Sequence, residues 1–271
     1  MFSPACAKND IHFGDFLRLL RYRVDFSRKN PDYFSPDGLI VFTGPQGSGK
    51  TLSAVNYICN LMELYPKAIL VTNVAIADYP IVTFDDFLRQ NYRRMLYENL
   101  SDISVDTKAL LYSDYLRLNR VFPFNDADDL ITYSNLDEGV IFFIDEVQLY
   151  FNSLESKNIN MDVMAQISQQ RKQRKHIVCT SQVFGRLAKP LREQFNAVVQ
   201  CRCYLNSIQI NKFLDNEDIQ MSADGQHFTS KVVHTQIFIH KPSMYSRYDT
   251  SYIIEKGKFI APEGGSIYGN E

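Results

Sequence analysis

The sequence predicts an α/β protein with a mainly parallel central sheet flanked by helices, a helical insertion, and antiparallel strands added near the C-terminus. Three features predict this class. A glycine-rich stretch at residues 44–51 stands between a β-rich apolar run and a segment of helical periodicity. An apolar run at 139–144 ends beside two acids, and residues 197–260 contain several segments in which apolar and polar side chains alternate.

Length and composition support a real hydrophobic core, because the chain has 271 residues and is 45% hydrophobic. We expect an N-terminal amphipathic helix and its lead-in over 1–37. The main domain should cover 38–260, with the helical insertion at about 83–135, and residues 261–271 should form a loose tail.

Charge and cysteine content exclude several classes of protein. A net charge of −2 excludes a globally basic nucleic-acid coat, although a local basic patch stays open. The five cysteines form no paired framework, which suits a reducing cytoplasm, and we interpret Cys201 and Cys203 as strand residues rather than metal ligands. No window reaches the ~18 uncharged apolar residues of a membrane span, so we expect contact with a membrane only through a partner.

The first regular element is expected within residues 10–34. Its amphipathic part places Arg18, Arg21 and Arg23 among apolar side chains. This basic face could contact nucleic acid or acidic lipid, but we favour a solvated helix face.

The glycine-rich stretch matches the phosphate-binding loop G-x-x-x-x-G-K-[ST] at every fixed position. A strand is expected at 39–43 before it and a helix at 52–62 after it, which is the context that the motif requires and which argues against a chance glycine-rich turn. We expect Lys50 to reach the β- and γ-phosphates and Thr51 to bind Mg²⁺ through its hydroxyl. The expected nucleotide contacts are Gly44, Pro45, Gln46, Gly47, Ser48, Gly49, Lys50, Thr51 and Leu52.

A second buried strand is expected at 68–73, parallel to the first. Residues 83–135 are helical in pattern and rich in aromatic and charged side chains. Arg89, Arg93 and Arg94 lie beside tyrosines there and could form a surface on which DNA bases stack. We favour the alternative that the tyrosines pack in a helical layer while the arginines face water.

The apolar run at 139–144 predicts a strand buried on both faces. Asp145 and Glu146 follow it directly, so two carboxyl groups should lie where the edge of the sheet meets a ligand. Asp145 fits a residue that holds Mg²⁺ through its outer shell, and Glu146 fits a base that orients and deprotonates an attacking water.

A helix is expected at 161–173 and a strand at 177–182, joined by a basic cluster over 171–176. Gln182 ends this strand, where its amide could sense the γ-phosphate. Arg171 or Arg174 could extend into the site of a neighbouring subunit, or the basic cluster could simply cap the end of the helix. Arg192 is a second, less supported candidate for such an arginine.

Further strands are expected at 197–204, 207–213, 231–239 and 252–260. Their alternation suggests antiparallel additions to the sheet edge, with a hairpin at Leu205 and Asn206. His227, His234 and His240 are too scattered to predict a metal site.

The order of these motifs resembles the N-terminal ATPase domain of the zonular occludens toxin (Zot) family, the assembly and export ATPases of filamentous phages related to FtsK/HerA-type DNA-pumping motors. The resemblance covers residues 38–250 and is strongest at 44–51, 145–151, 170–172 and 180–182. It implies a RecA-like P-loop NTPase fold, ATP with Mg²⁺, and a homo-oligomeric ring that acts on DNA, such as a phage genome, or on virion proteins. Zot-type proteins continue into a membrane span, for which we find no counterpart in the sequence, so we expect no insertion into the bilayer.

We therefore predict a P-loop ATPase of the additional-strand, catalytic-glutamate type that acts in the cytoplasm. The residues predict the ATPase, whereas only the resemblance implies a motor for virion assembly, export or genome packaging. Two alternatives stay open: a scaffold that ATP switches with little turnover, and a DNA-translocating ATPase of conjugation or repair. Glu146 favours turnover over a pure switch.

Overall fold

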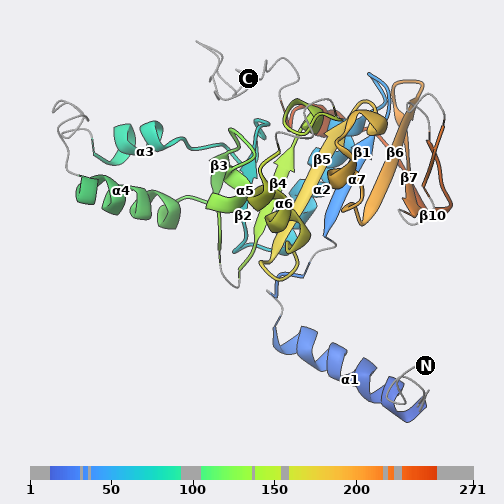
Figure 1. Ribbon diagram of the computed structural model, residues 1–271, viewed down its shortest axis with the longest axis horizontal. Coiled ribbons are helices and arrows are strands. Elements are labelled where there is room, and N and C mark those ends of the chain that lie inside the picture. The colour runs from blue at the N-terminus through green and yellow to red at the C-terminus, as the bar shows by residue number, and fades with distance from the viewer. Residues whose placement is uncertain are drawn as a thin grey trace. The chain divides into compact units, whose positions relative to one another are not determined.

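The computed structural model describes residues 13–30, 33–35, 38–92, 105–135, 138–153, 159–215, 219–222 and 228–248. The chain falls into two compact units that divide between Tyr33 and Phe34. Figure 1 shows the elements of both units.

The N-terminal unit contains one helix, α1 (Phe13–Lys29), in its described residues. The rings of Tyr22 and Phe26 stack at 6.1 Å between centroids, and Phe26 meets the ring of Tyr33 edge-on at 4.9 Å. Most of the other described side chains of this helix, both basic and apolar, are exposed. A helix is therefore present where the sequence predicts one, and its amphipathic character stays a prediction.

The second unit is built on an eight-stranded sheet with the order β10-β7-β6-β1-β5-β4-β2-β3. The six strands from β6 to β3 run parallel, whereas β7 and β10 are antiparallel additions at one edge. A separate pair, β8 and β9, completes the strands in the described part of the chain. Their bounds are β1 (Leu39–Thr43), β2 (Ile69–Thr72), β3 (Val121–Pro123), β4 (Val140–Ile144), β5 (Lys175–Ser181), β6 (Ala197–Tyr204), β7 (Ile208–Asp215), β8 (Gln220–Met221), β9 (Phe228–Thr229) and β10 (Val232–Ile239).

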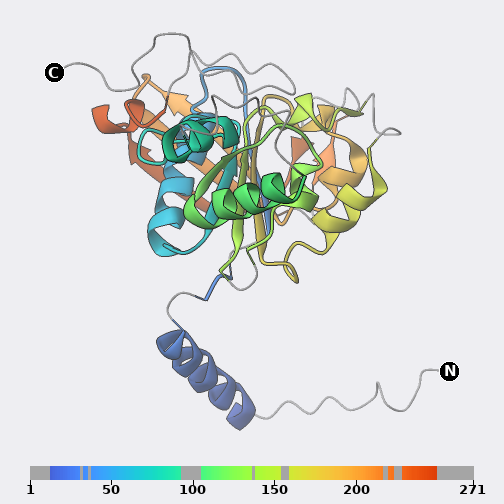
Figure 2. The same cartoon turned by 90° about the vertical axis from the view of Figure 1, so that its left-hand side faces the viewer.

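Helices cover both faces of this sheet, as Figure 2 shows with α2 and α6 on opposite sides. Alternate residues of β1 explain the arrangement, because side chains along a strand point to opposite faces. Ile40 and Phe42 pack with α2, whereas Leu39 and Val41 pack with α6 and α7. The helical elements are α2 (Lys50–Leu64), α3 (Phe84–Asn91), α4 (Val105–Leu118), α5 (Asp129–Thr132), η3 (Val147–Leu149), α6 (Met161–Ser168), η5 (Phe184–Arg186), α7 (Lys189–Arg192) and α8 (Pro242–Tyr245).

The insertion at 83–135 is not entirely helical, which corrects the prediction. It contains α3, α4 and α5, but Val121–Pro123 forms β3 and pairs parallel with β2 at the sheet edge. A three-residue strand is too short to show a period in the sequence, and the pairing with β2 decides its conformation. The tyrosines of the insertion do pack, since Tyr115 is buried against Phe87 and Phe122. Arg93 and Arg94 lie outside the described residues.

The helix predicted at 161–173 is also shorter than expected, because α6 ends at Ser168 and turns follow. Lys175 and His176, assigned to the basic cluster, instead begin the buried strand β5. Lys175 Nζ donates to Leu130 O and Gln166 Oε1, which satisfies a buried ammonium. Burial lowers the pKa of His176 to about 4, so its ring is neutral between Gly38 O and the Tyr57 hydroxyl at pH 7.

The C-terminal strands agree with the sequence pattern. The hairpin from β6 to β7 turns at Leu205 and Asn206, which both have positive φ, and β10 pairs antiparallel with β7. The strand predicted at 252–260, His227 and the tail at 261–271 lie outside the described residues. In the part of the chain that the structure describes, no helix is long and apolar enough to cross a membrane.

Arg120 provides a test of how the sheet edge is joined to α2. Its guanidinium donates to Ala68 O at 2.9 Å and to Met62 O and Tyr65 O at 2.8 Å, so it satisfies carbonyls at the end of α2. We expect Arg120→Ala to lower the free energy of unfolding by about 2–4 kcal/mol, because three carbonyls lose a charged donor. Chemical denaturation measures this loss.

Arg117→Ala is the matched control. Arg117 lies three residues away with a side chain that is 74% exposed, and it pairs with Asp114 on the same helix. Its loss should change stability by no more than about 0.5 kcal/mol. Equal effects of the two substitutions would contradict the structural role of Arg120.

Candidate functional site

The phosphate-binding loop lies between β1 and α2, as the sequence predicts. Two of its glycines are required by close contacts. A Cβ at Gly49, which has φ 77°, would lie 2.1 Å from Gln209 Oε1. A Cβ at Gly44 would lie 2.6 Å from Ser48 Oγ and 2.7 Å from Cys201 O. The loop can therefore keep this path only with glycine at both positions.

Strand β7 supports the loop through buried amides. Gln209, which is 0% exposed, donates from Nε2 to Ser48 O at 3.0 Å and to Asn211 Oδ1 at 2.8 Å. Ser53 of α2 donates to the same Asn211 oxygen at 3.3 Å. This support was not predicted from the sequence, although polar residues alternating with Ile208 and Ile210 are a visible signal. That alternation resembles a solvent-exposed face, and only the contact with the loop explains it.

Asp145 lies at the carboxyl end of β4 and accepts two hydroxyl donors. Thr51 Oγ1 donates to its Oδ1 at 3.0 Å, and Thr180 Oγ1 of β5 donates to the same atom at 2.6 Å. Burial raises the pKa of Asp145, and the hydrogen bond from Thr180 opposes that rise. The loop's threonine and the first acid are thus in direct contact.

Asn73 directly follows β2 and forms two hydrogen bonds with the backbone of Asp145. The Asp145 N–H donates to Asn73 Oδ1 at 2.8 Å, and Asn73 Nδ2 donates to Asp145 O at 3.0 Å. Both backbone polar groups of Asp145 are therefore paired with one side chain. This pairing fixes the position of the chain at the end of β4, and with it the positions of the carboxyl groups of Asp145 and Glu146.

Glu146 has a left-handed backbone, with φ 51° and ψ 51°. Its N–H donates to Thr180 Oγ1 at 2.9 Å, which stabilises this uncommon conformation. Its carboxylate accepts from Gln182 Nε2 at 3.2 Å and from Gln148 Nε2, and lies 3.9 Å from Lys50 Nζ. Lys50, Glu146 and Gln182, predicted from separate motifs, therefore meet at one edge of the sheet.

Thr180 was not identified as a site residue from the sequence. It is fully buried in β5 and bridges both acids, since it accepts from the Glu146 N–H and donates to the Asp145 carboxyl group. Gln148 was also missed. A threonine inside a buried strand gives little signal, because threonine is common in strands for packing reasons alone.

The loop has polar atoms that suit an anion with several oxygens. Lys50 is only 7% exposed, and the buried Ser48 hydroxyl has no hydrogen-bond partner among the residues that the structure describes. The α2 N-terminus adds backbone N–H groups and a positive dipole end. Beside them, the oxygens of Thr51 and Asp145 are the type of ligand that Mg²⁺ prefers.

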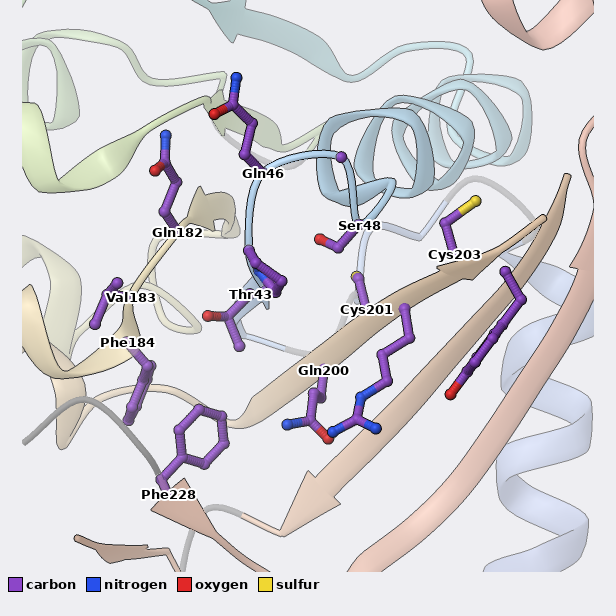
Figure 3. Close-up of a pocket in the computed structure, with 15 residues that line it drawn as sticks. Thr43, Gln46, Ser48, Gln182, Val183, Phe184, Gln200, Cys201, Cys203 and Phe228 are labelled. Carbon is purple, nitrogen blue, oxygen red and sulfur yellow. The ribbon is translucent and has the colours of Figure 1, made fainter. Parts of the chain in front are cut away.

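Two cavities adjoin the loop. The larger, of about 880 Å³, lies on the side of Gln46 and Gln182, and Figure 3 shows Gln182 and Phe184 across the loop from Cys203 of β6. The smaller, of about 380 Å³, lies at the first turn of α2 and includes Leu52. Gly47 of the loop and Cys203 of β6 border both cavities, so the two are neighbours.

Arg171 and Arg174 do not lie at the same edge of the sheet as the loop within this chain. Arg171 and Arg174 precede β5, so they lie at the amino ends of the parallel strands, where Arg174 O accepts from the Val140 N–H that begins β4. The loop and the acids lie at the carboxyl ends. Arg192 ends α7, and its buried Nε has no hydrogen-bond partner in the described residues.

The strand order and the loop define a P-loop protein of the α/β class, in which β5 separates the strand of the loop from the strand of the acids. The chain belongs to the zonular occludens toxin (Zot) family, whose model matches residues 38–252. This confirms the resemblance found in the motifs.

Solved structures with similar folds include the N-terminal domain of zonular occludens toxin from Neisseria meningitidis, at 16% identity and a TM-score of 0.47, covering 78% of this chain and 98% of that one. Another is the genome packaging NTPase B204 from Sulfolobus turreted icosahedral virus 2 in complex with ATP-gammaS, at 11% identity and a TM-score of 0.44, covering 76% and 98%. A DnaB-like replicative helicase matches at 11% identity and a TM-score of 0.40, covering 82% and 67%. No curated protein sequence matches the chain.

The contact between Asn73 and Asp145 yields a stability test. We expect Asn73→Ala to lower the free energy of unfolding by about 2–4 kcal/mol, because an N–H and a carbonyl lose their partners away from water. Asn91→Ala is the control: its amide donates to Phe87 O from an exposed residue, so its loss should cost no more than about 0.5 kcal/mol. Denaturant unfolding compares the two, and a wild-type stability for Asn73→Ala would contradict the role assigned to this contact.

Proposed function

We propose that this protein binds ATP with Mg²⁺ at the phosphate-binding loop and hydrolyses it, with Glu146 as the general base. The observation that carries the proposal is the meeting of Lys50, Glu146 and Gln182 at one edge of the sheet. Membership of the Zot family also supports an NTPase-type function.

The loop residues Gly44 to Leu52 bind the triphosphate in this proposal. Backbone N–H groups and the α2 dipole stabilise its negative charge, and the Ser48 hydroxyl is available for one phosphate oxygen. Lys50 is positioned for the β- and γ-phosphates because its ammonium lies beside Glu146, on the side where water attacks. Thr51 and Asp145 would hold Mg²⁺, which when bound neutralises charge on the phosphate oxygens.

Glu146 accepts the proton of the attacking water in the proposed reaction. The amides of Gln182 and Gln148 hold its carboxylate, and the Thr180 hydroxyl fixes its backbone. Gln182 is exposed and borders the larger cavity, so it can exchange its contact with Glu146 for one with the γ-phosphate. That exchange is how Gln182 would sense whether the γ-phosphate is present.

The biological role that we propose is a motor for phage virion assembly, export or genome packaging. The family supports it, and a homo-oligomeric ring acting on DNA or virion proteins is the form that such a motor would take. Arg171 and Arg174 could act only from a neighbouring subunit, since both lie at the far edge of the sheet in their own chain, and Arg192 is a further candidate for such an arginine. A scaffold switched by ATP is the alternative.

Replacing the base gives a direct test of hydrolysis. We expect Glu146→Gln to reduce the rate of phosphate release by about 10²–10⁴-fold, because the amide cannot accept the proton, while ATP still binds. Glu193→Gln is the control, since Glu193 is exposed and pairs with Lys189 on the surface. Steady-state release and equilibrium binding are measured for both. Unchanged release in Glu146→Gln would show that another group is the base.

The motor role is tested by adding DNA to the wild-type protein. We expect double-stranded or single-stranded DNA to raise the ATPase rate severalfold, because a translocating enzyme couples turnover to its polymer. Heparin controls for a general effect of polyanions, and Glu146→Gln with DNA controls for a contaminating ATPase. No response to either form of DNA would count against DNA pumping and favour the scaffold.

A further inference from the structure

The smaller cavity is bordered by a segment near the end of the described chain. Residues 240–248 contact α2 through α8, and three contacts attach this segment to the loop after β2. Arg247 O accepts from the Ala77 N–H at 2.7 Å, Arg247 Nε lies 3.4 Å from Asp78 Oδ2, and Tyr248 forms a bridge with Ile76. This segment, which forms one wall of the cavity, is therefore attached to the loop that follows β2.

An aromatic ring forms part of this wall. The Tyr245 hydroxyl lies 2.6 Å from His240 Nδ1 and 3.2 Å from Asn206 O, and its ring meets the His240 ring edge-on at 5.5 Å. These contacts fix the hydroxyl end of the side chain. Tyr245 is nevertheless 50% exposed and borders the cavity, so part of its ring is open to a ligand.

The same wall is joined to the phosphate-binding loop. His240 Nε2 lies 3.1 Å from Gln209 Oε1, and the Gln209 amide donates to Ser48 O at 3.0 Å. Because the Gln209 oxygen can only accept, His240 Nε2 is the donor in this contact. One chain of hydrogen bonds therefore runs from Tyr245 to the backbone of the loop.

The orientation of the bound triphosphate decides which of the two cavities can receive the rest of the nucleotide. Its terminal phosphate must face Glu146 and Gln182, and Gln182 borders the larger cavity. The rest of the nucleotide then extends along the loop toward the first turn of α2, where Leu52, the last of the proposed loop contacts, borders the smaller cavity. Its volume of about 380 Å³ lies within the range of roughly 300–1,000 Å³ that is usual for small-molecule sites.

We propose that the smaller cavity receives the nucleobase of the bound nucleoside triphosphate, with the base stacked on the exposed part of the Tyr245 ring and the Asn206 side chain beside it. This inference rests on the proposed function, because the loop must bind the phosphates. It assigns Tyr245, His240 and Asn206 to the nucleotide site as residues that distinguish a nucleoside triphosphate from bare polyphosphate. Stacking on an aromatic ring tolerates different bases, so ATP and GTP should both use it.

The test compares two ligands in the full chain: a non-hydrolysable ATP analogue and inorganic tripolyphosphate, each titrated calorimetrically with Mg²⁺. We expect Tyr245→Ala to weaken binding of the analogue about tenfold, the effect of losing one base stack. Tripolyphosphate affinity should change by less than about twofold, because it does not reach the ring. Tyr245→Phe keeps the ring and should lose less affinity for the analogue than Tyr245→Ala.

Tyr204→Ala is the matched control, because Tyr204 is similarly exposed at 48% but borders the larger cavity. It should leave the ratio of the two affinities unchanged. The ratio is the readout, so it remains informative even if Tyr245→Ala disturbs the loop and weakens both ligands. An unchanged ratio in Tyr245→Ala, or a change in Tyr204→Ala instead, would overturn the assignment while leaving the phosphate site intact. Failure of the wild-type protein to bind either ligand would overturn the proposed function itself.

Discussion

The structure of the site depends on one buried carboxyl group, that of Asp145, and on the neighbours that satisfy it. Each of four adjacent strands in the order β1-β5-β4-β2 contributes to this contact at its carboxyl end. Thr51 follows β1, Thr180 lies in β5, Asp145 follows β4 and Asn73 follows β2. A buried carboxyl group without such donors would be costly, so the contact requires the parallel strands to end together. That requirement fixes the position of Glu146 as well.

The antiparallel half of the sheet supports the loop rather than the acids. Gln209 of β7 binds the carbonyl of Ser48, and His240 after β10 binds Gln209. The strands added near the C-terminus therefore do more than extend the sheet, since they fix the backbone that would bind phosphate. The two halves meet at Lys50, which begins α2 on the loop side and lies beside Glu146 on the acid side.

The sequence predicted the parts of the site that are local in the chain, namely the loop with its flanking strand and helix and the acids after a buried strand. It did not predict Gln209, which contacts a residue 161 positions away, because alternation with isoleucines is typical of an exposed strand face. Nor did it predict β3, whose three residues depend on pairing with β2. The position of Arg171 and Arg174 could have been inferred, because residues that precede a parallel strand lie at the edge opposite to those that follow it.

The contacts of Glu146 suggest how nucleotide binding would prepare the proposed base. In the structure its carboxylate has Lys50 at 3.9 Å and the amides of Gln182 and Gln148 as partners. A triphosphate offers Lys50 a more highly charged partner, and Gln182 can turn to the γ-phosphate from its exposed position. Both changes leave the carboxylate with fewer hydrogen-bond donors, so its oxygens would be available to accept from an attacking water. The hydrogen bond from the Glu146 N–H to Thr180 does not depend on these partners, so the carboxylate would keep its position.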